Sequence, residues 1–198
     1  MKPKEAIRRQ EDSREVPEES MRKKDGIVMK QEREELSKQD RILIEKMMEY
    51  YAGDPKRIQH FLKVYEFARM IGEAEGLSEE EMHILRTAAI VHDIGIKVSE
   101  EKYQSSGGKY QEQEGPAVAL PLLQSLAYRD EVIDRVLYLI AHHHTYHHIE
   151  GMDYQILVEA DFLVNLYEDG CSGESAKKAD DTIFRTQTGK YYLKLMFM

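Results

Sequence analysis

Apolar residues recur every three or four positions along most of the chain, which is the spacing of one face of an α-helix. The first such stripe lies between Glu34 and Tyr51. A second helix is expected to begin at Asp54-Pro55, because aspartate caps a helix well and proline fits its first turn, and to end near Gly76. No segment alternates apolar and polar residues in the manner of a strand. The pattern therefore predicts an all-α fold with seven or eight helices.

The third predicted helix ends in the most unusual dipeptide of the chain. Ser78 and Glu81 have the spacing of a capping box, in which two side chains satisfy free main-chain N–H groups at a helix start. The apolar stripe that follows runs to His92 and Asp93. Gly95 is expected to end this helix by adopting a left-handed or otherwise unusual backbone.

The rest of the chain reads as further helices joined by polar segments. The pattern predicts a loop over 97–115, a helix that begins at Pro116, a helix whose N-cap is Asp130, a helix over 154–169, a mobile connection over 170–181, and an apolar end over 182–198 that docks on the bundle.

Composition and charge indicate which part of the chain folds and which partners are disfavoured. Residues 1–36 are nearly all polar or charged and are expected to form a flexible or loosely helical tail, which leaves 37–198 as one helical domain. The net charge of -9 and the pI of about 5.4 argue against binding to duplex DNA or RNA and against a basic membrane anchor. The apolar runs are too short to span a bilayer, and the N-terminus does not resemble a secretion signal. The single cysteine, Cys171, fits a cytoplasmic protein.

The candidate chemistry lies where polar residues interrupt the apolar stripes. His92 and Asp93 follow an apolar run, and both are costly to bury without a partner. Together they offer the nitrogen and oxygen donors that suit a divalent metal, although a surface pair or a single core histidine would give the same dipeptide. Five of the eight histidines lie between 142 and 148. If the preceding helix continued, the pairs His143/His147 and His144/His148 would have metal-chelating spacing; the alternative is a surface tract.

Two more helices place a ligand-type residue on or beside an apolar face. Asp161 falls within the stripe of the 154–169 helix and needs a cation, which is either a metal or an arginine such as Arg57. Asn165, one turn later, would line the same cavity. His60 lies in the first turns of its helix, where a packing or capping role is the alternative to ligation.

The order of these residues, His, His-Asp and Asp on successive helices, resembles the HD-domain superfamily of metal-dependent phosphohydrolases. The resemblance covers roughly 54–168 and implies an HD-type helical bundle with one or two divalent ions. It does not distinguish Mn, Fe, Co, Mg, Ni and Zn. It implies that the first ion is held by His60, His92, Asp93 and Asp161. The positions that match the second ion of two-metal members are Glu114, which stands where a histidine is usual, His143 and His144.

The function that this resemblance implies is hydrolysis of a phosphate ester or anhydride of a small molecule, with a nucleotide as the expected class. Asp93 would bridge two ions, and Lys97, one place later than the family's phosphate-binding lysine, is the second catalytic candidate. Arg57, Lys109 and Asn165 are the candidates for contacts with substrate. The Gly-Tyr-Pro signature of the cyclic-di-GMP branch is absent. The alternatives are an HD-type di-iron oxygenase and a non-catalytic nucleotide sensor, and the sequence leaves a homodimer open.

Overall fold

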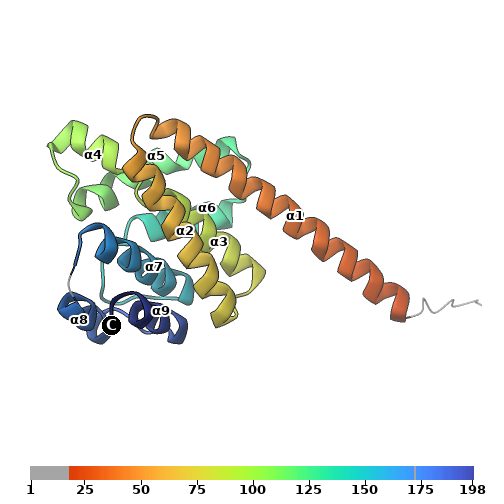
Figure 1. Cartoon of the computed structure of the whole chain (residues 1–198). Helices are drawn as coiled ribbons and strands as arrows, with labels where there is room; N and C mark the ends of the chain where they lie inside the picture. The colour runs from red at the N-terminus through yellow and green to blue at the C-terminus, as the bar shows by residue number, and fades with distance from the viewer. Residues whose placement is uncertain (1–17, 172) are drawn as a thin grey trace, which may run out of the picture. The chain divides into compact units, whose positions relative to one another are not determined.

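A computed structural model describes residues 18–171 and 173–198, and all of their regular secondary structure is helical (Figure 1). The predicted all-α fold is therefore confirmed. The helices are α1 (Glu18–Tyr50), α2 (Pro55–Glu75), α3 (Glu79–Val91), α4 (Ile96–Tyr103), α5 (Gly108–Ser125), α6 (Asp130–Ile140), α7 (Met152–Glu168), α8 (Gly173–Thr182) and α9 (Gln187–Phe197).

The chain divides into two units, Met1–Ser37 and Lys38–Met198. In the first unit, α1 begins at Glu18, so the predicted helix start near Glu34 was too late. Residues 1–17 of the predicted tail lie outside the described residues.

The core of the second unit is built around α3 and α7. Helix α2 packs on both of them, α3 and α7 pack on each other, and α6 packs on α3. Close packing of α2 on α3 depends on Gly72, where a Cβ atom would lie 2.5 Å from the sulfur of Met82. Ala88 and Ala89 are fully buried at the end of α3. These small residues bring the C-terminal end of α3 into the centre of the bundle.

The predicted helix starts at Asp54 and Ser78 are confirmed. The Asp54 side chain accepts a hydrogen bond from the Arg57 main-chain N–H, and Ser78 and Glu81 form the capping box. Gly95 has an ordinary φ of -72°, so the expected left-handed backbone was wrong. Its smallness serves a close contact instead, because a Cβ atom there would lie 2.6 Å from the Gln111 carbonyl oxygen.

The segment predicted as a loop over 97–115 is mostly helical, since it contains α4 and the first half of α5. Pro116 lies inside α5 and does not begin a helix. The glycines that suggested a loop lie at close contacts. A Cβ atom on Gly108 would lie 2.6 Å from the His144 ring, and one on Gly115 would lie 2.4 Å from Ile140.

Three further expectations need correction. Arg129 is the N-cap of α6, and Asp130 is its first residue. Helix α6 ends at Ile140, so the histidine tract lies in turns, and the predicted i, i+4 pairs of histidines do not form. The predicted mobile connection over 170–181 contains α8. The apolar C-terminal segment does dock as expected, through α9 on α2 and α7.

Among the described residues, no helix combines the length and the apolar composition that crossing a membrane requires.

Candidate metal centre

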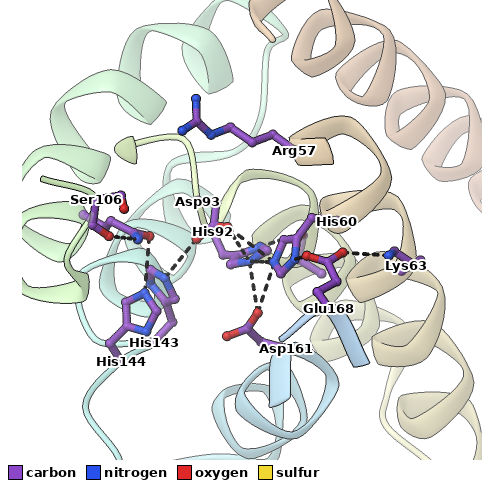
Figure 2. Close-up of polar contacts among 12 residues, drawn as sticks. Arg57, His60, Lys63, His92, Asp93, Ser106, His143, His144, Asp161 and Glu168 are labelled. Carbon is purple, nitrogen blue, oxygen red and sulfur yellow. Dashed lines mark hydrogen bonds and ion pairs between the residues drawn. The ribbon is translucent and has the colours of Figure 1, made fainter. Parts of the chain in front are cut away.

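Four of the predicted ligands converge at the centre of the second unit (Figure 2). His60 projects from α2, His92 caps the C-terminus of α3, Asp93 follows it, and Asp161 lies in the middle of α7. The His92 side chain is fully buried, and those of His60 and Asp161 are nearly so. The structure thus brings together residues that are up to about a hundred positions apart, as the sequence pattern predicts.

We call these four residues the first donor group. The two Nε2 atoms of its histidines are 3.3 Å apart. Asp161 Oδ1 lies 3.2 Å from His60 Nε2 and 3.6 Å from His92 Nε2. Asp93 Oδ2 lies 3.4 Å from His60 Nε2 and 3.5 Å from His92 Nε2. Donors about 2.1 Å from a central ion in tetrahedral geometry are separated by about 3.4 Å, so these five distances between the histidines and from each carboxylate to the histidines fit a divalent metal.

The orientation of the imidazole rings also fits a metal. His92 Nδ1–H donates to the Ala89 carbonyl oxygen at 2.9 Å, and His143 Nδ1–H donates to the Ile140 carbonyl oxygen at 2.8 Å. A carbonyl oxygen only accepts, so in the neutral ring these bonds place the proton on Nδ1 and leave the lone pair on Nε2. This is the arrangement that metal-binding histidines adopt.

A second donor group consists of Asp93, His143 and His144, which each offer one atom within 4.8 Å of the others. Asp93 Oδ1 lies 3.5 Å from His143 Nε2. This Nε2 atom is buried and has no hydrogen-bond partner, a costly state that a metal would relieve. Asp93 therefore directs one carboxylate oxygen to each group.

The match of a family model agrees with this arrangement. The model described as HD domain matches residues 57–181, which is more than half of the chain and includes every member of both donor groups. The chain belongs to the HD domain family. HD domains bind divalent metals, and both donor groups are compatible with that property. The predicted membership is confirmed.

A solved structure shows the same fold. The crystal structure of a predicted HD superfamily hydrolase from an uncultured Thermotogales bacterium superposes with a TM-score of 0.58. The two sequences are 19% identical, and the match covers 78% of this chain and 82% of that chain. A search of curated proteins finds no match to this sequence.

Within the first donor group, the carboxylates favour protonation of the histidines, and the histidines favour ionisation of the carboxylates. Burial alone would lower the pKa of His92, but the carboxylates of Asp93 and Asp161 outweigh it and raise the pKa to about 9. The pKa of His60 is raised in the same way, against the effect of burial. Burial opposes ionisation of Asp161, yet His60 and His92 hold its pKa well below the usual range. In the second donor group, burial and the neighbouring His143 lower the pKa of His144 to about 4.

His144 has other polar neighbours besides the second donor group. Its Nε2 atom lies 3.3 Å from the Gln111 side-chain oxygen, and its Nδ1 atom lies 3.3 Å from the Tyr146 hydroxyl. His147 and His148, which the predicted helical pairs had included, contact each other with ring centroids 5.5 Å apart.

Glu114 is not brought to the second donor group. Its carboxylate accepts hydrogen bonds from Lys102 Nζ at 2.5 Å and from the Tyr103 hydroxyl at 2.7 Å. It therefore links α4 to α5, and the structure leaves three protein donors in the second group.

Lys97 and Lys109 also lie away from the donor groups. The Lys97 ammonium lies 5.3 Å from the centroid of the Tyr50 ring, in a separate surface cavity. Lys109 is exposed near the start of α5. Neither lysine lines the cavity beside the first donor group.

Beside the first donor group lies a cavity of about 290 Å³. Arg57 lines it, and its guanidinium pairs with Asp54 at 3.1 Å and Glu100 at 2.5 Å, so Arg57 is not the cation that neutralises Asp161. Asn165 lines it too, as predicted. The other residues of its wall are Asp54, Lys56, His60, Asp93, Ile96, Ser106, Gln111, His144, Asp161 and Glu168.

Sequence reasoning missed two residues next to the first donor group. Glu168 Oε2 lies 3.2 Å from His60 Nδ1, and Lys63 Nζ lies 2.6 Å from Glu168 Oε1 (Figure 2). Glu168 stands seven residues after Asp161, which is two helical turns along the same face of α7. Lys63 stands three residues after His60 on α2. Continuing each helical face beyond the ligand would have identified both.

Proposed function

We propose that this HD domain is a phosphohydrolase that cleaves a phosphate ester or anhydride of a small molecule, with a nucleotide as the expected class. The observation that carries the proposal is the position of the cavity, because His60, Asp93 and Asp161 form part of its wall. A phosphoryl group in the cavity would thus lie directly beside the first donor group.

The donor groups define which residues would hold the metal. The first ion would be bound by His60, His92, Asp93 and Asp161, and a second by Asp93, His143 and His144. A bound divalent ion lowers the pKa of water from about 15.7 toward about 7, and so supplies hydroxide near neutral pH. Nitrogen and carboxylate donors together suit Mn, Fe, Co, Ni and Zn, whereas Mg prefers oxygen donors.

The protein's own cations would bind the phosphate. Arg57 presents a planar guanidinium that is suited to bidentate contacts with phosphate oxygens, and Asp54 and Glu100 hold it at the cavity wall. Lys56 is exposed at the same wall and adds positive charge there. Since the chain as a whole carries a net charge of -9, these local cations offset the repulsion of an anionic substrate.

The remaining polar residues of the wall would orient the rest of the substrate. Asn165, Gln111 and Ser106 supply amide and hydroxyl groups that donate and accept hydrogen bonds. The cavity volume of about 290 Å³ is near the lower end of small-molecule sites, which are roughly 300–1,000 Å³. This volume supports a small phosphorylated molecule as the substrate.

The direct test joins metal analysis to activity. Purified protein is assayed for bound metal and then for phosphate release from a panel of phosphorylated nucleotides with Mn²⁺, Fe²⁺, Co²⁺ or Mg²⁺. We expect His92→Ala to lose metal and activity together. The matched control His147→Ala changes an exposed histidine outside both donor groups and should retain both. Full activity in metal-free His92→Ala would exclude the proposal.

The same experiment separates the alternatives. Oxygen consumption at a coloured, redox-active iron centre without phosphate release would indicate the oxygenase. Tight nucleotide binding without turnover would indicate the sensor.

A second test addresses the role of Arg57. Arg57→Ala should raise KM by about 10-fold or more, because a hydrogen bond to a charged group contributes about 1.5–3 kcal/mol. Metal content should not change. Arg69→Ala is the control on the same helix, since Arg69 pairs with Glu66 and Glu73 away from the cavity. An unchanged KM in Arg57→Ala would remove Arg57 from the substrate site.

A further inference from the structure

His60, His92 and His143 each form a hydrogen bond through Nδ1, but the acceptors are of two different kinds. His92 and His143 each bond a main-chain carbonyl three residues earlier, of Ala89 and Ile140. Both histidines stand just beyond a helix C-terminus, where the last carbonyls of a helix lack intrahelical partners. Main-chain carbonyl groups at helix ends thus orient these two rings, and neither ring uses another side chain for this bond.

His60 has no such carbonyl to use. It lies inside α2, where main-chain carbonyls are engaged in helical hydrogen bonds, so its Nδ1–H needs a side-chain acceptor. Glu168 of α7 provides it at 3.2 Å, and Lys63 of α2 donates to the other oxygen of the same carboxylate at 2.6 Å. Figure 2 shows Lys63, Glu168 and His60 in one row that leads to the first donor group.

The side chains around Glu168 hold its carboxylate in a fixed position. Its side chain is only 11% exposed. Lys63 is itself held by the Tyr167 ring, whose centroid lies 5.4 Å from Nζ. Both oxygens of the carboxylate are used, so Glu168 has a fixed position between α2 and α7.

We propose that Glu168 is a positioning residue for the metal centre, and that Lys63 holds it in place. Glu168 fixes the ring proton of His60 on Nδ1 and turns the Nε2 lone pair toward the first donor group. A carboxylate acceptor also makes Nε2 a stronger donor than a carbonyl acceptor does. The inference rests on the proposed metal-dependent function and adds the residues that prepare His60 for the ion.

The first test measures the affinity for Zn²⁺ alone, by competition with a chromophoric chelator. Glu168→Leu should weaken the tighter Zn²⁺ site by about 10–100-fold, as loss of a histidine's outer partner does elsewhere. Glu168→Gln keeps an acceptor without the charge, and should lose less. Lys63→Met should show a smaller loss in the same direction. Asp169→Asn is the matched control, because it removes an exposed carboxylate at the next position, and it should bind like wild type.

The second test follows the histidine rings directly. In Zn²⁺-loaded protein labelled with ¹⁵N-histidine, the Nδ1–H signal of His60 should be shifted by its carboxylate acceptor, unlike those of His92 and His143. In Glu168→Gln the His60 signal should move, and the other two should not. A purely structural role of Glu168 would lower the thermal stability of the metal-free protein without changing either Zn²⁺ affinity or this signal.

The outcomes distinguish the two proposals. If wild type binds no Zn²⁺ or other divalent ion, the proposed function fails. If wild type binds Zn²⁺ and Glu168→Gln binds it equally with an unchanged His60 signal, the positioning role is overturned while the metal site stands. The near-isosteric glutamine variant decides the matter even if Glu168→Leu does not fold.

Discussion

The two donor groups share Asp93 but differ in how completely the protein builds them. The first has two imidazole Nε2 atoms 3.3 Å apart and two carboxylates that each lie 3.2 to 3.6 Å from both of them, with the Lys63–Glu168 ion pair behind His60. The second has one shared carboxylate and two imidazoles. Glu114, which would have been its second carboxylate, is engaged by Lys102 and Tyr103.

This difference leads us to expect two affinities. Two carboxylates beside two imidazoles offset the charge of a divalent ion, and their preset spacing reduces the reorganisation that binding requires. The second group supplies fewer donors and less negative charge. We infer that the first group fills first and that the second group fills only at higher metal concentration.

The largest effect is expected from Asp93→Ala, because Asp93 is the residue common to both groups. This variant should lose both ions, and phosphate release should fall by roughly 10³-fold or more, since little hydroxide forms near neutral pH without the ion. Metal analysis and initial rates measure the two losses. The control Asp134→Ala removes an exposed carboxylate of α6 and should behave like wild type. Retention of a tightly bound ion by Asp93→Ala would show that the groups do not depend on a shared ligand.

His143→Ala tests the second group alone. We expect it to lose the weaker ion and to retain the tighter one, because only Asp93 and His144 remain in the second group. Titration of metal-free protein would show one binding step where wild type shows two. His142→Ala is the neighbouring control, because the His142 ring stacks on Tyr138 outside both groups. Loss of the tighter ion in His143→Ala would reverse the order that we infer.

Proton release should distinguish the groups in wild type. In the metal-free protein the pKa of His92 is raised to about 9, so its protonation stabilises the fold below the unfolded pKa of about 6.5, and that contribution is lost as the pH rises through about 9. A metal ion at the first group must displace this proton. Its affinity should therefore increase about tenfold per pH unit for each displaced proton, up to about pH 9.

The second group should respond less to the same change. The pKa of His144 is lowered to about 4, so at neutral pH this ring is uncharged and has one nitrogen without a proton, from which a metal displaces nothing. Calorimetric titrations in buffers of different ionisation enthalpy count the protons released at each step. Equal proton release at both steps, or an affinity at the first step that does not change with pH, would contradict the assignment.

The first donor group was predictable because its members are fixed by local sequence signals. Asp54 and Ser78 set the starts of α2 and α3, and the apolar stripes then determine which residues face the core. His60 and Asp161 fall on or beside those stripes. The helix stop after Val91 places His92 and Asp93 at the bundle centre. Helical periodicity and capping thus placed these residues on or beside the core faces, and the resemblance to the HD superfamily then grouped them as ligands of one ion.

The second group was less predictable because it depends on tertiary packing. The segment 97–115 is polar and contains glycines, which resembles a loop in sequence, whereas these glycines serve the contacts of α4 and α5 with their neighbours. The orientation of Glu114 is decided by Lys102, on a helix that the sequence pattern did not predict. The same packing places Lys97 and Lys109 away from the cavity. No periodicity along the chain encodes these side-chain directions.

The smallest effect on metal binding is expected from Glu114→Ala. Because its carboxylate pairs with Lys102 and Tyr103, both metal affinities should stay within about twofold of wild type, as for substitutions outside a site. The midpoint of thermal unfolding should fall, since α4 loses a link to α5. Lys102→Met should lower it in the same direction, and the double variant should add little, because the two residues share one interaction. Loss of the weaker ion in Glu114→Ala, with His143→Ala as reference, would instead show that Glu114 turns into the second group when the ion binds, and that the two groups are more alike than their contacts indicate.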